Sequence, residues 1–195
     1  MKKYFILYII AIFLASGCGQ KSKPAHEDEG FFPVLSYIKS QVAQVDTSLY
    51  GIKKIIWLDS IRTDTVYLKR EEFRNLAKDF LEIPDLSDKK YASLYTEEKF
   101  YDEGLNRVVL TCKPKKPDEA IIQRQEVLIT PDPSGDKVSN FIIDLSMTSK
   151  GSSLQKKLLW QVDHSFQVVT SVQKHGQAET TSIMKVIWKD EKENE

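Results

Sequence analysis

The chain has 195 residues, with 28 basic and 28 acidic side chains, and 41% of its residues are hydrophobic. This length and composition fit one globular domain, or at most two small ones, and exclude a disordered chain. The even charge balance excludes a general nucleic-acid binder, because no excess of basic residues is present to neutralise phosphates.

The first 17 residues have the layout of a secretory signal peptide. Two lysines precede an apolar run at 4–15, and Ser16-Gly17-Cys18 follows it. A run of twelve residues is too short to span a bilayer comfortably, because a membrane helix needs about 20. We therefore expect this segment to guide export and to be removed.

Residues 14–18, Leu-Ala-Ser-Gly-Cys, resemble the lipobox of bacterial lipoproteins, with Ala15 where that family usually has Leu. The resemblance implies cleavage between Gly17 and Cys18, an S-diacylglycerol group on Cys18, and N-acylation of the new terminus by a fatty acid such as palmitate. It places the protein in the bacterial cell envelope, anchored by lipid at the outer membrane, on its periplasmic or its surface side. An ordinary signal peptide with an incidental cysteine and an uncleaved anchor are the alternatives.

Residues 18–30 are expected to form a flexible tether behind the lipidated cysteine, because no large apolar residue follows Cys18 in this segment. Loss of residues 1–17 reduces the 28 basic residues to 26 and leaves the 28 acidic ones, a net charge of −2. This charge offers no attraction to an anionic membrane surface, so the lipid would act alone as the anchor.

Residues 31–195 are interpreted as a single α+β domain that ends in a charged tail at 189–195. Apolar residues at spacings of three and four predict amphipathic helices at 31–45 and 69–82. Alternating apolar residues between them predict a β-hairpin with strands at 54–61 and 65–68. The segment 85–104 has no clear pattern.

The chain has a β pattern from residue 105 onward. Six strands are predicted, at 105–113, 124–130, 137–148, 154–162, 166–173 and 181–188. Their short connections are rich in turn residues, which indicates an antiparallel meander. We expect an α+β fold in which a bent meander of six or more strands packs against the two N-terminal helices. Phe31-Phe32-Pro33-Val34 and the Pro-Asp-Pro turn at 131–133 are similar to segments of uncharacterised Bacteroidota lipoproteins, a resemblance that implies no particular activity.

Several groups contain the residue types of a catalytic or metal site without the required pattern. Asp163-His164-Ser165 has the members of a catalytic triad, but consecutive residues in a tight turn point apart. The three histidines, His26, His164 and His175, have no metal-ligand spacing.

Acidic residues suggest two further sites. Asp132, Ser134 and Asp136 could begin a calcium loop, but Ile143 stands where an EF-hand needs Glu. The pairs at 71–72 and 97–98, all Glu, are more typical of a solvated face than of paired catalytic acids. We therefore predict no catalytic residue, no metal ligand and no cofactor.

The second cysteine and the tryptophans complete the candidates. Cys112 follows an alternating apolar strand and is expected to be a buried, unreactive thiol. Trp57, Trp160 and Trp188 all fall in predicted strands, and core packing explains most such aromatic residues. The alternative is that these three tryptophans form a surface for a ligand or a partner.

The pattern as a whole favours a lipid-anchored envelope protein without enzymatic activity that binds a protein partner or supports envelope assembly. The alternative is a carrier or sensor for a small ligand, a lipid or a sugar, held on a concave sheet face. An enzyme is the third hypothesis, and it requires acids such as Glu72 and Asp144 to converge.

Overall fold

A computed structural model describes residues 30–57 and 63–189. Within these ranges the chain forms nine β-strands, four α-helices and one 3-10 helix. Cys18, Gly17 and most of the predicted tether lie outside the described residues, as do residues 190–195 of the predicted tail. In the described residues no helix is long and apolar enough to cross a membrane.

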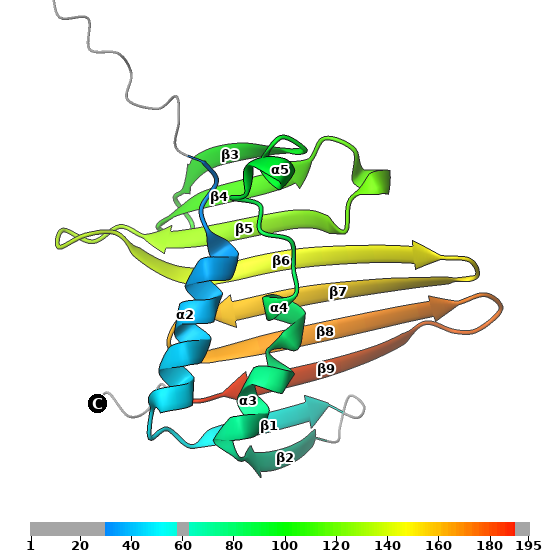
Figure 1. Ribbon diagram of the computed structural model, residues 1–195, viewed down its shortest axis with the longest axis horizontal. Helices are drawn as coiled ribbons and strands as arrows, with labels where there is room; N and C mark the ends of the chain where they lie inside the picture. Colours follow the sequence, from blue (N-terminus) through cyan, green and yellow to red (C-terminus); the bar gives the residue numbers. More distant parts are fainter. Residues whose placement is uncertain (1–29, 58–62, 190–195) are drawn as a thin grey trace, which may run out of the picture.

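All nine strands belong to one open antiparallel sheet, in the order β2-β1-β9-β8-β7-β6-β5-β4-β3 (Figure 1). Strands β3 to β9 follow one another as a meander, whereas the hairpin β1–β2 joins the sheet beside β9. The strands are β1 Ile52–Trp57, β2 Thr63–Leu68, β3 Tyr95–Asp102, β4 Arg107–Pro114, β5 Ile122–Thr130, β6 Lys137–Ser149, β7 Ser152–Gln161, β8 Ser165–Lys174 and β9 Thr180–Ile187.

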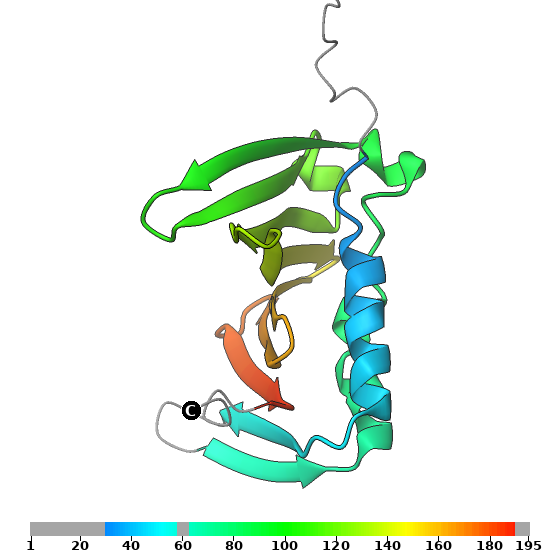
Figure 2. The same ribbon diagram turned by 90° about the vertical axis from the view of Figure 1, so that its left-hand side faces the viewer.

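The helices lie on one face of this twisted sheet (Figure 2). They are α2 Val34–Thr47, α3 Arg70–Leu76, α4 Lys78–Leu81 and α5 Lys89–Ala92, and a 3-10 helix η1 spans Pro117–Glu119. Helix α2 starts directly after Pro33, a residue whose fixed φ suits the start of a helix. Its buried positions Val34, Leu35, Ile38, Val42 and Val45 recur every three to four residues, so one stripe of the helix faces the sheet.

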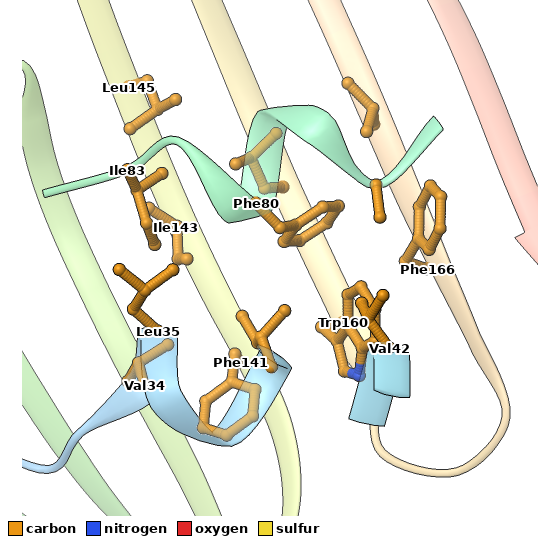
Figure 3. Packing of buried hydrophobic residues seen from close by; sticks show 14 of the residues in the cluster. Val34, Leu35, Val42, Phe80, Ile83, Phe141, Ile143, Leu145, Trp160 and Phe166 are labelled. Atoms are coloured by element: carbon orange, nitrogen blue, oxygen red, sulfur yellow. The ribbon is translucent and has the colours of Figure 1, made fainter. Parts of the chain in front are cut away.

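The space between helices and sheet is filled by large side chains (Figure 3). The Phe80 ring of α4 packs edge-on against Trp160, at 5.1 Å between ring centroids, and against Phe166 at 5.3 Å. Trp160 stacks on Phe166 at 5.3 Å. Such offset and edge-on aromatic contacts add to the free energy gained by burying the rings.

The predicted antiparallel sheet of six or more strands, packed against helices, is confirmed. The described chain is mostly β with four helices, so the coarser description, an antiparallel sheet with some helices, fits it better than an α+β fold with two N-terminal helices. The helix predicted at 69–82 is divided into α3 and α4 at Ala77, where ψ is 1°. The hairpin and the segment 85–104 both contribute strands to the sheet, which raises the number to nine.

Candidate functional site

The two faces of the sheet differ in what covers them. Along β6, Phe141 and Ile143 point toward the helices and are fully buried, so Ile142 and Asp144 point to the opposite face. We call this opposite face the outer face. No helix of the described chain lies over it (Figure 2).

A row of apolar side chains crosses the outer face diagonally, and we call it the apolar stripe. Its members are Phe100, Val109, Leu128, Ile142, Leu159, Val169, Ile183 and Trp57, from β3 to β1. Most of them are direct cross-strand neighbours. Between β5 and β6, and again between β7 and β8, the next member lies two residues further along the chain than the direct cross-strand partner. Direct and diagonal neighbours on one face lie within side-chain reach.

The stripe is deeply buried where it crosses β4 and β5, although no helix covers it there. Val109 is 4% exposed and Leu128 is 8% exposed, whereas Phe100 at the sheet edge is 48% exposed. Arg107 of β4 reaches across β5 to donate to Ser139 Oγ at 3.0 Å and to Asn140 Oδ1 at 2.8 Å. The aliphatic part of such an arginine covers apolar neighbours while its head stays polar.

Charged residues flank the stripe on β5 and β6. The Arg124 guanidinium donates to Asp144 at 2.8 Å and to Glu126 at 3.0 Å. Burial lowers the pKa of Arg124, but the two carboxylates outweigh burial and leave it raised. The guanidinium is therefore a permanent charge held by two acids.

Two polar atoms beside this ion pair have no hydrogen-bond partner in the described part of the chain. They are Thr111 Oγ1 and Asp144 Oδ1, and both are buried. Thr111 of β4 pairs with Glu98 of β3 and with Glu126 of β5, so its side chain lies on the outer face as well. Buried polar atoms without partners cost free energy, so both atoms destabilise this part of the sheet.

A polar cleft of about 840 Å³ lies on β6 and β7, beside the stripe. Asp144, Ser146, Gln155, Lys157 and Ser171 line it from the outer face. Lys157 stands opposite Asp144 in the register of β6 and β7. The outer face thus combines an apolar stripe with acids on β5 and β6 and lysines on β7 and β9, Lys185 being the β9 member.

The three tryptophans are not brought together. Trp160 and Trp188 are 0% and 3% exposed and lie 5.3 Å apart in the core beneath the helices. Trp57 alone belongs to the outer face, where it pairs with Ile183 at the end of the stripe. Of the three, only Trp57 is placed to contact a partner on the outer face.

Cys112 is enclosed in the core and is 3% exposed. Burial raises the pKa of its thiol to about 12, and the carboxylate of Glu97, 3.5 Å from Sγ, adds to the rise. A thiol in this setting is protonated at neutral pH and is a poor nucleophile.

The turn at Asp163-His164-Ser165 has no nucleophile–base contact. The backbone N–H of Asp163 donates to Gln41 Oε1 at 2.8 Å, and Ser165 Oγ donates to Gln161 Oε1 at 3.2 Å. Asp163 has φ at 63°, a left-handed conformation suited to a tight turn. These contacts support a structural turn between β7 and β8.

The acidic candidates also have structural roles. The Glu72 carboxylate accepts the backbone N–H of Lys69 at 2.9 Å and caps α3 on the helix side of the sheet, whereas Asp144 is on the outer face. These two acids therefore do not converge. Asp132 accepts from Ser134 N and Lys137 Nζ, both at 2.8 Å, and closes the turn between β5 and β6. Residues 30–57 and 63–189 contain no cluster of three or more His, Cys, Asp or Glu side chains suited to a metal.

The apolar stripe is not among the sites predicted above, although the sequence contains a signal for it. A sheet covered on one face alternates apolar and polar residues, whereas strands apolar on both faces contain adjacent apolar residues. Such adjacent residues recur in five strands, as Val108-Val109, Val127-Leu128, Ile142-Ile143, Leu158-Leu159 and Val168-Val169. The second residue of four of these pairs, and Ile142 of the fifth, belong to the stripe.

We compared the chain with protein-family models, with curated proteins and with solved structures, and none of the three comparisons found a match.

Proposed function

We propose that this is a non-enzymatic binding protein of the bacterial cell envelope, anchored by lipid at Cys18, that holds a folded protein partner against the outer face of its sheet. The apolar stripe carries this proposal. It crosses eight strands, roughly 34 Å at the usual spacing between strands, a length that suits an interface of standard size.

The charges beside the stripe define the partner. It would present an apolar ridge to the stripe and carboxylates to Lys157 and Lys185. Interfaces of this kind have an apolar centre and a charged rim, and the rim determines orientation and the rate of association. The paired state of Arg124, Glu126 and Asp144 fits such a rim better than an acid–base pair.

The docking face can be tested by photocrosslinking in intact cells. A photoreactive amino acid at Leu159 should give one discrete adduct of defined mass, and the same amino acid at Ile121, which is 47% exposed away from the stripe, should give none. Adding Ile142→Arg should remove the Leu159 adduct, because it places a charge in the stripe. No adduct at Leu159, or equal adducts at both positions, would overturn the proposal.

The lipid anchor has a separate test. Cys18→Ser should abolish acylation and move the protein from the membrane fraction to the soluble fraction. Intact mass and fractionation measure both effects. An unchanged mass and an unchanged fractionation would show that Cys18 carries no lipid.

The polar cleft beside β6 and β7 favours a second candidate, a carrier or sensor for a sugar. Its hydroxyl, amide and carboxylate groups suit a polyhydroxy ligand better than a lipid. Titration with a panel of envelope oligosaccharides, followed by NMR shifts at Gln155 and Ser171, tests this candidate. Shifts that Asp144→Asn abolishes would support it, and a panel without shifts would refute it.

A further inference from the structure

The part of the apolar stripe that is open to a partner is short. Val109 and Leu128 are already buried, so the accessible part begins on β6 and ends on β1. It crosses five strands, about 19 Å at the usual spacing between strands. Its members, all half-buried, are Ile142, Leu159, Val169, Ile183 and Trp57.

This part of the stripe is also one residue wide. Residues two positions apart on a strand point to the same face, so they form the rows beside the stripe. Both rows are polar from β6 to β9: one contains Asp144, Lys157, Ser171 and Thr181, and the other contains Asn140, Gln161, Gln167 and Lys185. A second sheet, including that of another copy of the chain, packs through a broad apolar face, which these polar rows do not offer.

The backbone of these strands also limits the occupant. Strands β6, β7, β8, β9 and β1 each pair on both sides, so their N–H and C=O groups bond within the sheet. An extended segment lying across this face would find no backbone partners there, whereas a helix satisfies its own backbone groups. A helix is therefore the element that suits the stripe.

The helix-covered face of the same sheet shows how such a helix fits. Helix α2 runs across the strands there (Figure 1), and its 14 residues bury a stripe of apolar side chains. Its rise of about 21 Å is close to the length of the accessible stripe. One helical turn rises about 5.4 Å and neighbouring strands lie about 4.8 Å apart, so successive turns meet successive strands.

The charges beside the stripe add a requirement. Lys157 lies on one side of it and Lys185 on the other, and neither has a hydrogen-bond or ion-pair partner within residues 30–57 and 63–189. Asp144, beside the stripe on β6, is already held by Arg124. A helix with acidic residues on both sides of its apolar stripe is complementary to the two lysines.

We propose that the occupant of the accessible stripe is an amphipathic α-helix of the partner, about four turns long, that crosses the strands from β6 to β1. Its own apolar stripe is narrow and is flanked on both sides by acidic residues. This inference deepens the proposed partner-binding function and rests on it, because it names the element of the partner that enters the outer face. The sheet then lies between two helices, α2 and that of the partner.

A fluorescent peptide of about 18 residues tests the helix, with Leu at every third or fourth position, Glu on both sides of the Leu stripe and Ala elsewhere. Fluorescence anisotropy with the full chain should show binding. A peptide of the same composition whose Leu residues are spread around the helix should bind at least about tenfold more weakly. Ile142→Arg should weaken binding by a similar factor, because it places a charge in the stripe. The matched variant Leu94→Arg, at a residue outside the stripe that is 55% exposed, should leave binding unchanged.

A charge reversal keeps the test independent of any effect on the core. Lys157→Glu combined with Lys185→Glu should weaken binding of the Glu peptide and strengthen binding of a peptide with Lys in place of Glu. The cellular partner gives a second test. Photoreactive residues at Ile142, Leu159 and Val169 should join partner residues that advance by three or four at each step, as on one face of a helix. Steps of two, or adducts in separate segments, would overturn the inference.

Equal binding of the two Leu arrangements, or equal effects of Ile142→Arg and Leu94→Arg, would also overturn it. The two proposals fail separately. A peptide that does not bind while the Leu159 adduct forms in cells refutes the helix and leaves the docking face intact. A peptide that binds while no adduct forms in cells refutes the proposed function.

Discussion

The face of β4 on which Cys112 lies determines the reactivity of its thiol. Its side chain lies on the helix-covered face, opposite Glu97 on β3 and Gln125 on β5. Both burial and the neighbouring carboxylate disfavour the thiolate. The residue is therefore a small apolar core group, and its sulfur chemistry is suppressed by its surroundings.

We predict that Cys112 resists alkylation in the folded protein. In a Cys18→Ser background, which leaves Cys112 as the sole cysteine, iodoacetamide at pH 8 should react roughly a hundredfold or more slowly with the folded than with the unfolded chain. Mass spectrometry over time measures both rates. Equal rates would show that the thiol is accessible and ionised.

The same pKa gives a pH dependence of stability. The thiol ionises near pH 9.0 in the unfolded chain and near 12 in the folded protein. The stability that it contributes is present below pH 9 and is lost as the pH rises toward 12. Urea unfolding should therefore show that the wild type loses stability faster than Cys112→Ala in this window. Parallel pH profiles would contradict the prediction.

At the scale of elements, α4 is fixed to the sheet by a charge as well as by Phe80. Lys156 of β7 donates to Asp79 of α4 at 2.6 Å, and the two side chains are 19% and 33% exposed. Partial burial makes such a pair stronger than a surface pair, and the loss of either partner leaves a poorly solvated charge.

A double-mutant cycle with Asp79→Asn and Lys156→Met should give a coupling of about 1 kcal/mol, measured by urea unfolding. Lys78–Glu82 is the matched control, because it joins residues within the same segment at 3.6 Å and its side chains are 61% and 66% exposed. Its coupling should be below about 0.5 kcal/mol. Equal couplings would show that the Asp79–Lys156 pair is no stronger than an exposed pair.

The elements also show which features the sequence could predict. The core positions of α2 follow a local period of three to four residues, so Ile38 and Val42 were predicted and are buried. The break at Ala77 was not predictable, because no Gly or Pro marks it. Strand β3 was missed because half of its residues are charged and its edge position leaves most of them exposed.

At the scale of the whole molecule, the centre of the sheet is the part most resistant to local opening. Strands β6, β7 and β8 pair on both sides and hold Phe141, Trp160 and Phe166 beneath the helices. Strands β2 and β3 pair on one side only. Local opening requires the loss of the fewest contacts at these two edges.

We predict that hydrogen exchange follows this order. Amides of β6 to β8 should exchange last, those of β2 and β3 should exchange first, and peptide-level mass spectrometry resolves the strands. The comparison of β2 with β1 serves as an internal control, because the two strands share one hairpin but only β1 has neighbours on both sides. Faster exchange in β7 than in β2 would contradict this prediction.

The outer face and the position of the hairpin depend on long-range pairing. Alternation shows which residues share a face of a strand, but it does not identify the neighbouring strand. Trp57 was therefore grouped with Trp160 and Trp188 by residue type, whereas the register places it beside Ile183. The stripe emerges only when eight strands are aligned.

The pairing of β1 with β9 also determines when the β1–β2 hairpin can join the sheet during synthesis. The hairpin is made early, yet its only neighbouring strand in the sheet, β9, lies near the C-terminal end of the described chain. Closing so long a loop has an entropic cost that slows folding, and a growing chain folds from its N-terminal side. The hairpin must wait until β9 has been made. An interrupted or truncated product that lacks β9 would leave β1 paired with β2 alone and would leave β8 as an unpaired edge of the sheet.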